Sequence, residues 1–232
     1  MFLWPCPLPK PQVRTIEDLR SVLADEKCNK TGPAYFMYRD LAKSESDRSW
    51  LRNHLLRYDI TVMPPAVVCG EFVKTKGHYH PDNSLGYGYP EIYEIIEGKA
   101  EYLLQENRLL DAVTVKAREG NTVLIPPGYG HVTINTGNEK LVMANIVSTA
   151  FESCYGGYES HRGGVYYCME DGTYQPNPRY PEIPFLRHRD SCNFGEFSYL
   201  RNVSLYGLIG SQGALEFLNQ PEHFDFGHVL TG

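Results

Sequence analysis

From residue 58 onward the chain consists of short β-rich runs separated by turn residues, and this pattern restricts the fold more than any other feature. The runs cover residues 58–63, 66–68, 72–75, 91–97, 100–105, 112–116, 122–125, 131–135, 141–148 and 165–169. Gly, Pro and Asn punctuate the gaps, as in Pro64-Pro65, Gly98 and Gly137-Asn138. Many short strands with regular turns are typical of an antiparallel sandwich or barrel, so the sequence predicts an all-β core rather than a parallel sheet.

The segments on either side of this core differ from it in composition and in their pattern of apolar residues. Residues 1–14 are Pro-rich and are expected to form an extended arm, and Thr15 is placed to cap a first short helix. Residues 34–39 read as an aromatic strand. Ser46 is expected to cap a second helix, whose buried positions would be Trp50, Leu51, Leu55 and Leu56. We therefore expect an N-terminal arm and helix at 1–33 and a barrel at 34–180.

The last segment, 181–232, follows a second Pro-rich stretch and is short for a domain of its own. We expect it to be an extension that packs on the barrel or on a partner subunit. Within it, residues 205–209 could add a strand, and residues 214–218 could form a helical turn.

Net charge, hydropathy and cysteine spacing indicate which partners and which cellular compartment to expect. The 232 residues carry a net charge of -6, which favours neither nucleic acid nor an anionic membrane as a partner. No apolar run approaches the roughly 20 residues that span a bilayer, and the Pro-broken start does not read as a signal peptide. Six scattered cysteines without a C-x-x-C pair are expected to be reduced thiols. These features predict a cytoplasmic protein.

Three histidines and one glutamate form a candidate metal site. His78 and His80 are two residues apart, so in a strand both imidazoles point to the same face. By itself such a pair is more often two polar histidines on a solvated face. Glu91 opens a strongly β-forming run, and His131 follows a Pro-x-Gly turn. Three imidazoles and one carboxylate suit a first-row ion such as Fe, Mn, Ni, Co or Zn, and they leave coordination positions open for a substrate.

These stretches resemble the two sequence motifs of the cupin superfamily. Residues 120–135, G-NTVLI-PPG-YG-H-VTI-N, match the second motif, and H-Y-H followed by E-IYEIIE-G matches the latter half of the first. The resemblance implies a cupin double-stranded β-helix, a jelly-roll barrel. One departure is the long gap between His80 and Glu91, which makes residues 81–90 an insertion, either a lid or a subunit contact. Glu94 and Glu97 are rival carboxylates, but the spacing to Gly98 favours Glu91.

A narrower resemblance links the chain to the archaeal cupin-type glucose-6-phosphate isomerases. It is carried by TKGHYH (75–80), PEIYEIIEGKAEYLLQ (90–105), IPPGYGHVTINTGNEKL (125–141) and NPRY (177–180), and it covers about residues 34–180. It implies a homodimer that interconverts glucose 6-phosphate and fructose 6-phosphate with one divalent metal per chain, Fe, Mn, Ni or Zn. The implied metal ligands are His78, His80, Glu91 and His131, and the implied substrate contacts are Thr61, Thr75, Gly77, Tyr35, Tyr93 and Tyr155. Ser153 stands where the family has His, which leaves the preferred sugar epimer open.

Isomerisation of a sugar phosphate needs a group that moves a proton between C1 and C2 and a Lewis acid that stabilises oxygen charge. Glu91 is the candidate base, and Tyr93, on the same strand face, is a candidate donor. A hydride shift would use the same ligands without a base. Because few Lys or Arg lie near the motifs, we expect neutral donors to bind the phosphate: the hydroxyls of Thr61 and Thr75 and the backbone at Gly77, with Lys76 as a solvated charge.

Three other functions fit the same residues. The first is a mannose-6-phosphate isomerase or an epimerase, and the second is an Fe-dependent dioxygenase. The third is a cupin that binds a sugar without turning it over, which an open metal site disfavours.

Overall fold

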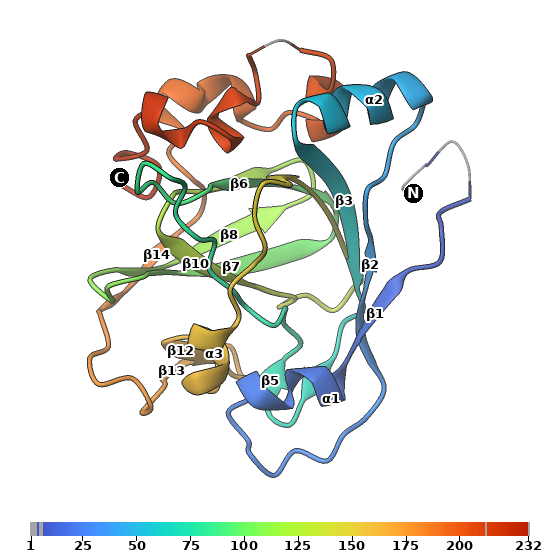
Figure 1. Ribbon diagram of the computed structural model, residues 1–232. Helices are drawn as coiled ribbons and strands as arrows, with labels where there is room; N and C mark the ends of the chain where they lie inside the picture. The colour runs from blue at the N-terminus through green and yellow to red at the C-terminus, as the bar shows by residue number, and fades with distance from the viewer. Residues whose placement is uncertain (1–3, 5–6, 212, 232) are drawn as a thin grey trace.

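The computed structural model describes residues 4, 7–211 and 213–231, and its main feature is a pair of β-sheets that face each other as a jelly-roll barrel (Figure 1). The larger sheet has the strand order β1 (Gln12–Thr15), β2 (Pro33–Tyr38), β3 (Leu56–Met63), β11 (Leu141–Ser148), β6 (Glu91–Glu97) and β9 (Thr122–Ile125). The smaller sheet has the order β10 (Tyr129–Ile134), β7 (Lys99–Glu106), β8 (Ala112–Arg118) and β14 (Leu186–Arg189). The predicted all-β barrel is confirmed.

The strands β6, β9 and β11 have the predicted bounds, and all three are largely buried. Their apolar side chains meet those of β3, β7 and β8 between the sheets in one continuous core, where Ile60, Ile92, Leu104 and Ile146 are fully buried. Each such aliphatic side chain stabilises the fold by about 1.5–3 kcal/mol relative to an exposed one. The strands that carry the candidate site are therefore held in place by the main core.

The smaller elements lie around the barrel. They are the strand pairs β4 (Val67–Val68) with β5 (Glu71–Phe72) and β12 (Tyr166–Cys168) with β13 (Tyr174–Pro176), the helices α1 (Ile16–Leu19), α2 (Glu45–Asn53) and α3 (Gly156–Ser160), and the 3₁₀ turn η1 (Arg20–Val22). Thr15 caps α1 through a capping box, as predicted. The prediction for the second helix was wrong in two details: its cap is Ser44 rather than Ser46, and Leu55 is 55% exposed rather than buried.

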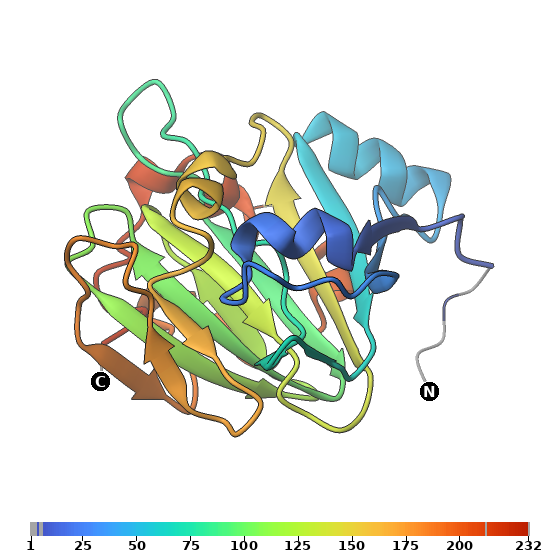
Figure 2. The same cartoon turned by 90° about the horizontal axis from the view of Figure 1, so that it is seen from below.

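The segment after residue 184 packs along one end of the barrel, opposite α1 and α3 (Figures 1 and 2). It contains β14 and the 3₁₀ turns η2 (Gly195–Leu200), η3 (Leu205–Leu208), η4 (Glu216–Leu218) and η5 (Pro221–His223). β14 pairs with β8 in parallel, an exception to the predicted antiparallel pattern. The predicted strand at 205–209 was wrong, because this stretch is η3 and its Leu205 N–H donates to the Glu94 carboxylate at 2.8 Å. The predicted turn at 214–218 is confirmed by η4.

The cysteines correct the expectation of six reduced thiols. Cys28 and Cys69 form a disulfide across 41 positions of sequence, joining the segment after η1 to the turn between β4 and β5. Cys154, Cys168 and Cys192 are free, and Cys6 lies outside the described residues. Spacing alone could not reveal this bond, because folding brings the two cysteines together.

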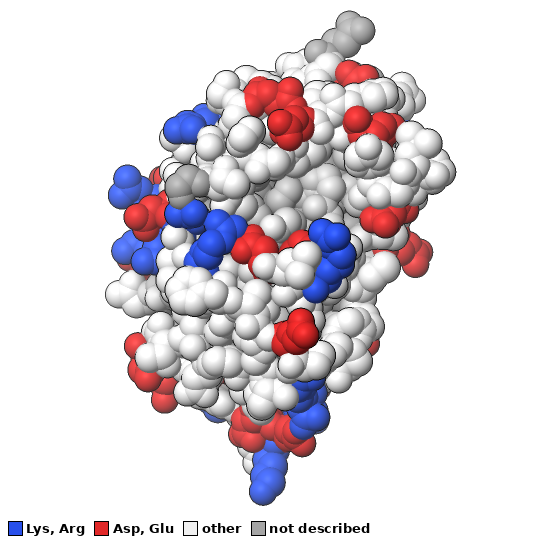
Figure 3. Space-filling model, turned by 90° about the vertical axis from the view of Figure 1, so that its left-hand side faces the viewer, with Lys and Arg blue, Asp and Glu red and all other residues white. Residues whose placement is uncertain are grey.

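The surface carries charges of both signs. On the face shown in Figure 3, Lys and Arg side chains are interspersed with Asp and Glu side chains and do not form one continuous basic stripe. Among the described residues, no helix combines the length and the apolar character that crossing a membrane requires.

Candidate metal centre and substrate cavity

The four predicted metal ligands come together inside the barrel. His78 and His131 face each other across an antiparallel bridge, where the His131 N–H donates to the His78 carbonyl at 3.1 Å. His80 follows two residues after His78, and Glu91 opens β6. One ligand atom from each of the four residues lies within 4.8 Å of the others. The side chains are almost entirely removed from solvent at His80, Glu91 and His131.

The distances between these atoms fit a bound cation. His80 Nε2 lies 3.2 Å from His78 Nε2. Glu91 Oε2 lies 3.4 Å from His80 Nε2 and 3.3 Å from His131 Nε2. This carboxylate oxygen is buried and has no well-formed hydrogen bond among the described residues. Buried polar atoms are normally satisfied, so a group of lone pairs converging on one point is the arrangement expected of a metal site.

Neighbouring groups orient the ligands. His80 Nδ1 lies 2.8 Å from the Tyr89 carbonyl, which makes Nδ1 the protonated nitrogen and leaves the Nε2 lone pair free for a metal. The Asn145 amide donates to Glu91 Oε1 at 2.7 Å from the adjacent strand β11. Asn145 was not predicted as a site residue, because it carries no motif signal.

The protonation states follow from burial and from the neighbouring groups. Burial lowers the pKa of His78 well below its ordinary value and also lowers the pKa of His131, so both imidazoles are neutral near pH 7. Burial alone raises the pKa of Glu91, but the imidazoles of His131 and His80 outweigh it and hold this pKa well below its usual range. Burial and the Glu91 charge raise the pKa of Tyr93 well above its ordinary value, so its phenol keeps its proton.

Tyr93 reaches the same centre from the strand position predicted for it. It lies two residues after Glu91 on β6, and its hydroxyl is 3.0 Å from His131 Nε2. The phenol is therefore a neutral hydrogen-bond donor beside the metal ligands.

Three of the four candidate metal ligands, His78, His80 and Glu91, line a cavity of about 660 Å³. All six residues predicted to contact the substrate line it: Thr61, Thr75, Gly77, Tyr35, Tyr93 and Tyr155. Ser153, at the position where the resemblance implies His, lines the cavity as well. A volume of this size is typical of a small-molecule site.

The segment 75–77 is a tightly packed part of the cavity wall. Gly77 has a φ of 78°, and a Cβ there would lie 2.6 Å from the Tyr158 ring and 2.8 Å from Val132. Only glycine fits without displacing buried side chains. Thr75 Oγ1 accepts the Thr133 N–H at 2.9 Å, so its own hydroxyl proton is free to donate into the cavity.

Several cations also line the cavity, which corrects the expectation that only neutral donors are available there. Arg14 from β1, Arg39 just after β2 and Arg57 from β3 all contribute to the wall. Lys76 lines it too and forms an ion pair with Glu159 at 2.5 Å, with only 15% of its side chain exposed. The arginines were not predicted because they lie far along the chain from the motifs, and only the pairing of β1, β2 and β3 brings them to the cavity.

The insertion at 81–90 covers one side of the metal ligands. The Tyr89 ring stacks on Phe151 at 4.7 Å between centroids, and Phe151 lies 4.5 Å from the His80 ring. The Asn83 amide donates to the Glu222 carboxylate at 2.8 Å, so the insertion is also tied to the C-terminal segment.

The chain is similar to known proteins both in sequence and in structure. A family model described as glucose-6-phosphate isomerase (GPI) matches residues 13–184. The glucose-6-phosphate isomerase of Thermococcus kodakarensis is 30% identical over 181 residues, which cover 75% of this chain and 89% of that protein. The enzyme of the same name from Thermococcus onnurineus is 31% identical over 63% of this chain and 74% of its own length. Among solved structures, Bacillus subtilis oxalate decarboxylase aligns with a TM-score of 0.37 and 22% identity, covering 52% of this chain and 28% of that one.

Proposed function

The chain belongs to the glucose-6-phosphate isomerase family, and from this premise we propose that it interconverts glucose 6-phosphate and fructose 6-phosphate with one divalent metal ion. One observation carries the proposal: four side chains that suit a metal ion, one of them the Glu91 carboxylate, converge beside the Tyr93 phenol at a cavity whose wall offers hydroxyls and cations. These are the parts that a metal-assisted aldose–ketose isomerase needs.

We assign the metal to His78, His80, Glu91 and His131. When bound there, a divalent ion acts as a Lewis acid toward the substrate oxygens. Burial keeps the imidazoles of His78 and His131 neutral, and the hydrogen bond of His80 Nδ1 to the Tyr89 carbonyl leaves the His80 Nε2 lone pair free for the ion. Fe, Mn, Ni and Zn all accept this ligand set.

Glu91 and Tyr93 are our candidates for moving and holding protons. The low pKa of Glu91 keeps it a carboxylate that can accept a proton from carbon, and the Asn145 amide fixes one of its oxygens while the other faces the ligand cluster. Tyr93 keeps its proton and can donate to an oxygen that gains negative charge. A hydride shift would make Glu91 a ligand only.

The phosphate is assigned to the rim formed by Thr75, Gly77 and Thr61. The Gly77 backbone permits close approach, and the threonine hydroxyls can donate. Arg14 and Lys76 add positive charge, and they stand 6.0 Å and 5.6 Å from the Tyr155 ring centroid. Tyr35, whose hydroxyl accepts the Lys76 N–H at 3.3 Å, would hold this turn in place.

The test is turnover of fructose 6-phosphate by chelator-stripped protein that is resupplied separately with Mn, Fe, Ni or Zn. Activity should return with a metal, and His78→Ala should lose both metal and activity. His223→Ala, which removes an exposed histidine outside the cavity, is the matched control and should behave like the wild type. A metal-loaded chain that leaves fructose 6-phosphate unchanged would refute the proposed reaction.

The same assay with mannose 6-phosphate addresses the sugar epimer. Ser153 lines the cavity in place of the histidine implied by the resemblance, so the contact on the sugar side differs. If this residue contacts the sugar where the two epimers differ, Ser153→His should shift the ratio of kcat/KM between glucose 6-phosphate and mannose 6-phosphate.

We propose that the chain forms a homodimer. The edge strand β1 has one neighbour among the described strands, and its Val13 is 46% exposed. Pairing of such edges would cover them. Sedimentation that shows a monomer at micromolar concentration would overturn this proposal.

We also propose that the protein works in the cytoplasm. Residues 1–33 are proposed as the N-terminal arm and helix, 34–180 as the barrel and 181–232 as the extension, and the first and last of these parts each add one edge strand to a sheet of the barrel, β1 and β14. A charged sugar phosphate does not cross a bilayer unaided, so the enzyme must share a compartment with its substrate. In a reducing cytoplasm the Cys28–Cys69 bond would be unusual. Alkylation of thiols during cell lysis would show whether this bond is present there.

A further inference from the structure

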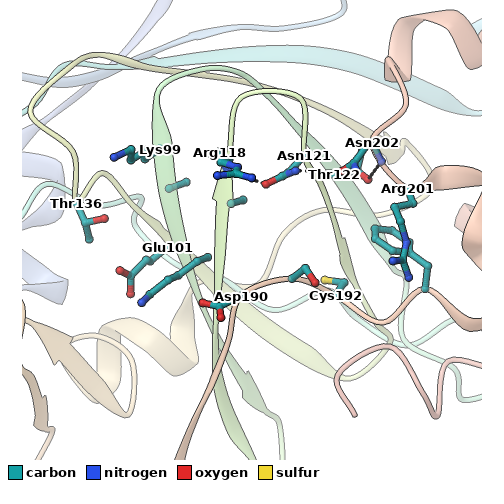
Figure 4. A pocket seen from close by; sticks show the side chains of 15 residues that line it. Lys99, Glu101, Arg118, Asn121, Thr122, Thr136, Asp190, Cys192, Arg201 and Asn202 are labelled. Atoms are coloured by element: carbon teal, nitrogen blue, oxygen red, sulfur yellow. Dashed lines mark hydrogen bonds between the residues drawn. The ribbon is translucent and has the colours of Figure 1, made fainter. Parts of the chain in front are cut away.

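A second cavity of about 480 Å³ lies between the sheet β10–β7–β8–β14 and the C-terminal segment (Figure 4). None of the residues that line it lines the catalytic cavity. In Figure 4, Lys99, Arg118 and Asn121 follow one side, Glu101, Asp190 and Cys192 follow the other, and Arg201 closes one end.

Four basic side chains line this cavity without an acidic partner among the described residues. They are Lys99, Lys116, Arg118 and Arg201, and none of them is in an ion pair within the described part of the chain. The two acidic residues in the lining are Glu101 and Asp190, and the Glu101 carboxylate accepts the Tyr174 hydroxyl at 2.6 Å. The lining therefore has an excess of positive charge, on a chain whose net charge is -6.

The strand register adds an independent indication of an anion. Lys99 on β7 stands directly opposite Arg118 on β8. Like charges at directly opposite positions destabilise a sheet. An anion bound between them would remove this repulsion.

The opposite wall comes from a segment beyond the family match. The match ends at residue 184, whereas the wall is made by residues within 190–202. It is held by hydrogen bonds: the Asn121 amide donates to the Asn202 side chain at 3.0 Å, and the Thr122 hydroxyl donates to the Leu200 carbonyl at 2.5 Å. Arg201 is oriented by the Phe194 ring, 5.7 Å from its guanidinium carbon. The cavity is thus a preformed feature that the C-terminal segment completes.

We propose that this cavity binds a small sugar that carries two phosphate groups. The basic side chains would hold the phosphates, and the carboxylates of Glu101 and Asp190 would accept hydrogen bonds from sugar hydroxyls. The volume suits a ligand of this size.

The test is isothermal titration of the metal-loaded chain with fructose 1,6-bisphosphate. The double variant Lys99→Gln/Arg118→Gln should weaken binding by about tenfold or more, because two phosphate contacts are lost. The matched control, Lys10→Gln/Lys27→Gln, removes the same charge from exposed positions outside the cavity and should keep the wild-type affinity. Turnover of fructose 6-phosphate should stay at the wild-type level in both double variants.

Three outcomes would overturn the proposal. They are no binding at millimolar bisphosphate, an equal loss in both double variants, and a loss in Thr75→Ala that Lys99→Gln/Arg118→Gln does not show. The last result would place the ligand in the catalytic cavity. Thermal unfolding checks the fold, because removing a like-charge pair should leave the melting temperature of Lys99→Gln/Arg118→Gln equal to or above that of the wild type.

Discussion

Replacing Gly77 by alanine should destabilise the protein far more than the same change at Gly86. The two glycines have almost the same backbone conformation, with φ of 78° and 82°. A Cβ at Gly86 meets nothing within 4 Å, whereas at Gly77 it would lie 2.6 Å from the Tyr158 ring and 2.8 Å from Val132. Both of those side chains are buried and cannot move aside freely. The pair of variants therefore separates backbone strain from steric overlap.

The magnitudes follow from these two contributions. A left-handed alanine costs about 1–2 kcal/mol in either place, and overpacking adds about 1–3 kcal/mol at Gly77 alone. The Gly77→Ala variant should thus be destabilised by about 3 kcal/mol and Gly86→Ala by about 1 kcal/mol. With a urea m value of about 3 kcal/mol/M, the midpoints should fall by about 1 M and about 0.3 M.

Urea unfolding followed by far-UV circular dichroism measures both midpoints, and steady-state kinetics on the same samples tests the site. Because Gly77 precedes His78, its displacement should also raise KM for fructose 6-phosphate, while Gly86→Ala should leave KM unchanged. Equal midpoints for the two variants would refute the argument that the Tyr158 ring leaves no room for a Cβ.

Three further predictions concern the supports of the site and the fold. Asn145→Ala leaves a buried carboxylate oxygen without its donor, at a cost of about 1–3 kcal/mol, so kcat for fructose 6-phosphate should fall by about tenfold; an unchanged kcat would show that this amide does not position the carboxylate. Reduction of the Cys28–Cys69 bond, which closes a loop of 41 residues, should lower the free energy of unfolding by about 4 kcal/mol on the chain-entropy model. Urea unfolding with and without reductant measures this loss, and the stability of Cys28→Ser/Cys69→Ser should not depend on reductant. Burial raises the pKa of Asp111, but the Arg187 guanidinium outweighs burial and lowers this pKa below its unfolded value. The resulting stability is present above about pH 4 and is lost as pH falls through the folded pKa. Between pH 5 and 3 the melting temperature should therefore fall more steeply with decreasing pH for the wild type than for Asp111→Asn, and an equal fall in both would contradict this assignment.

The barrel and the ligand cluster were predictable because both depend on local sequence relations. Turn residues in the sequence mark both ends of β6, β9 and β11. The two-residue period of an extended backbone places His78 with His80 and Glu91 with Tyr93. The substrate contacts that the family resemblance implies also line this cavity.

The tertiary structure decided what depends on residues far apart in the chain. Arg14 and Arg39 reach the catalytic cavity only through the pairing of β1, β2 and β3, and Asn145 reaches Glu91 only because β11 lies beside β6. The C-terminal segment illustrates the same limit. Residues 205–209 have the composition of a strand, but the end of the barrel offers the Glu94 carboxylate and a buried apolar surface, and these contacts favour a 3₁₀ turn. Strand pairing and packing depend on contacts between residues from the whole fold, so no pattern within a short window of sequence determines them.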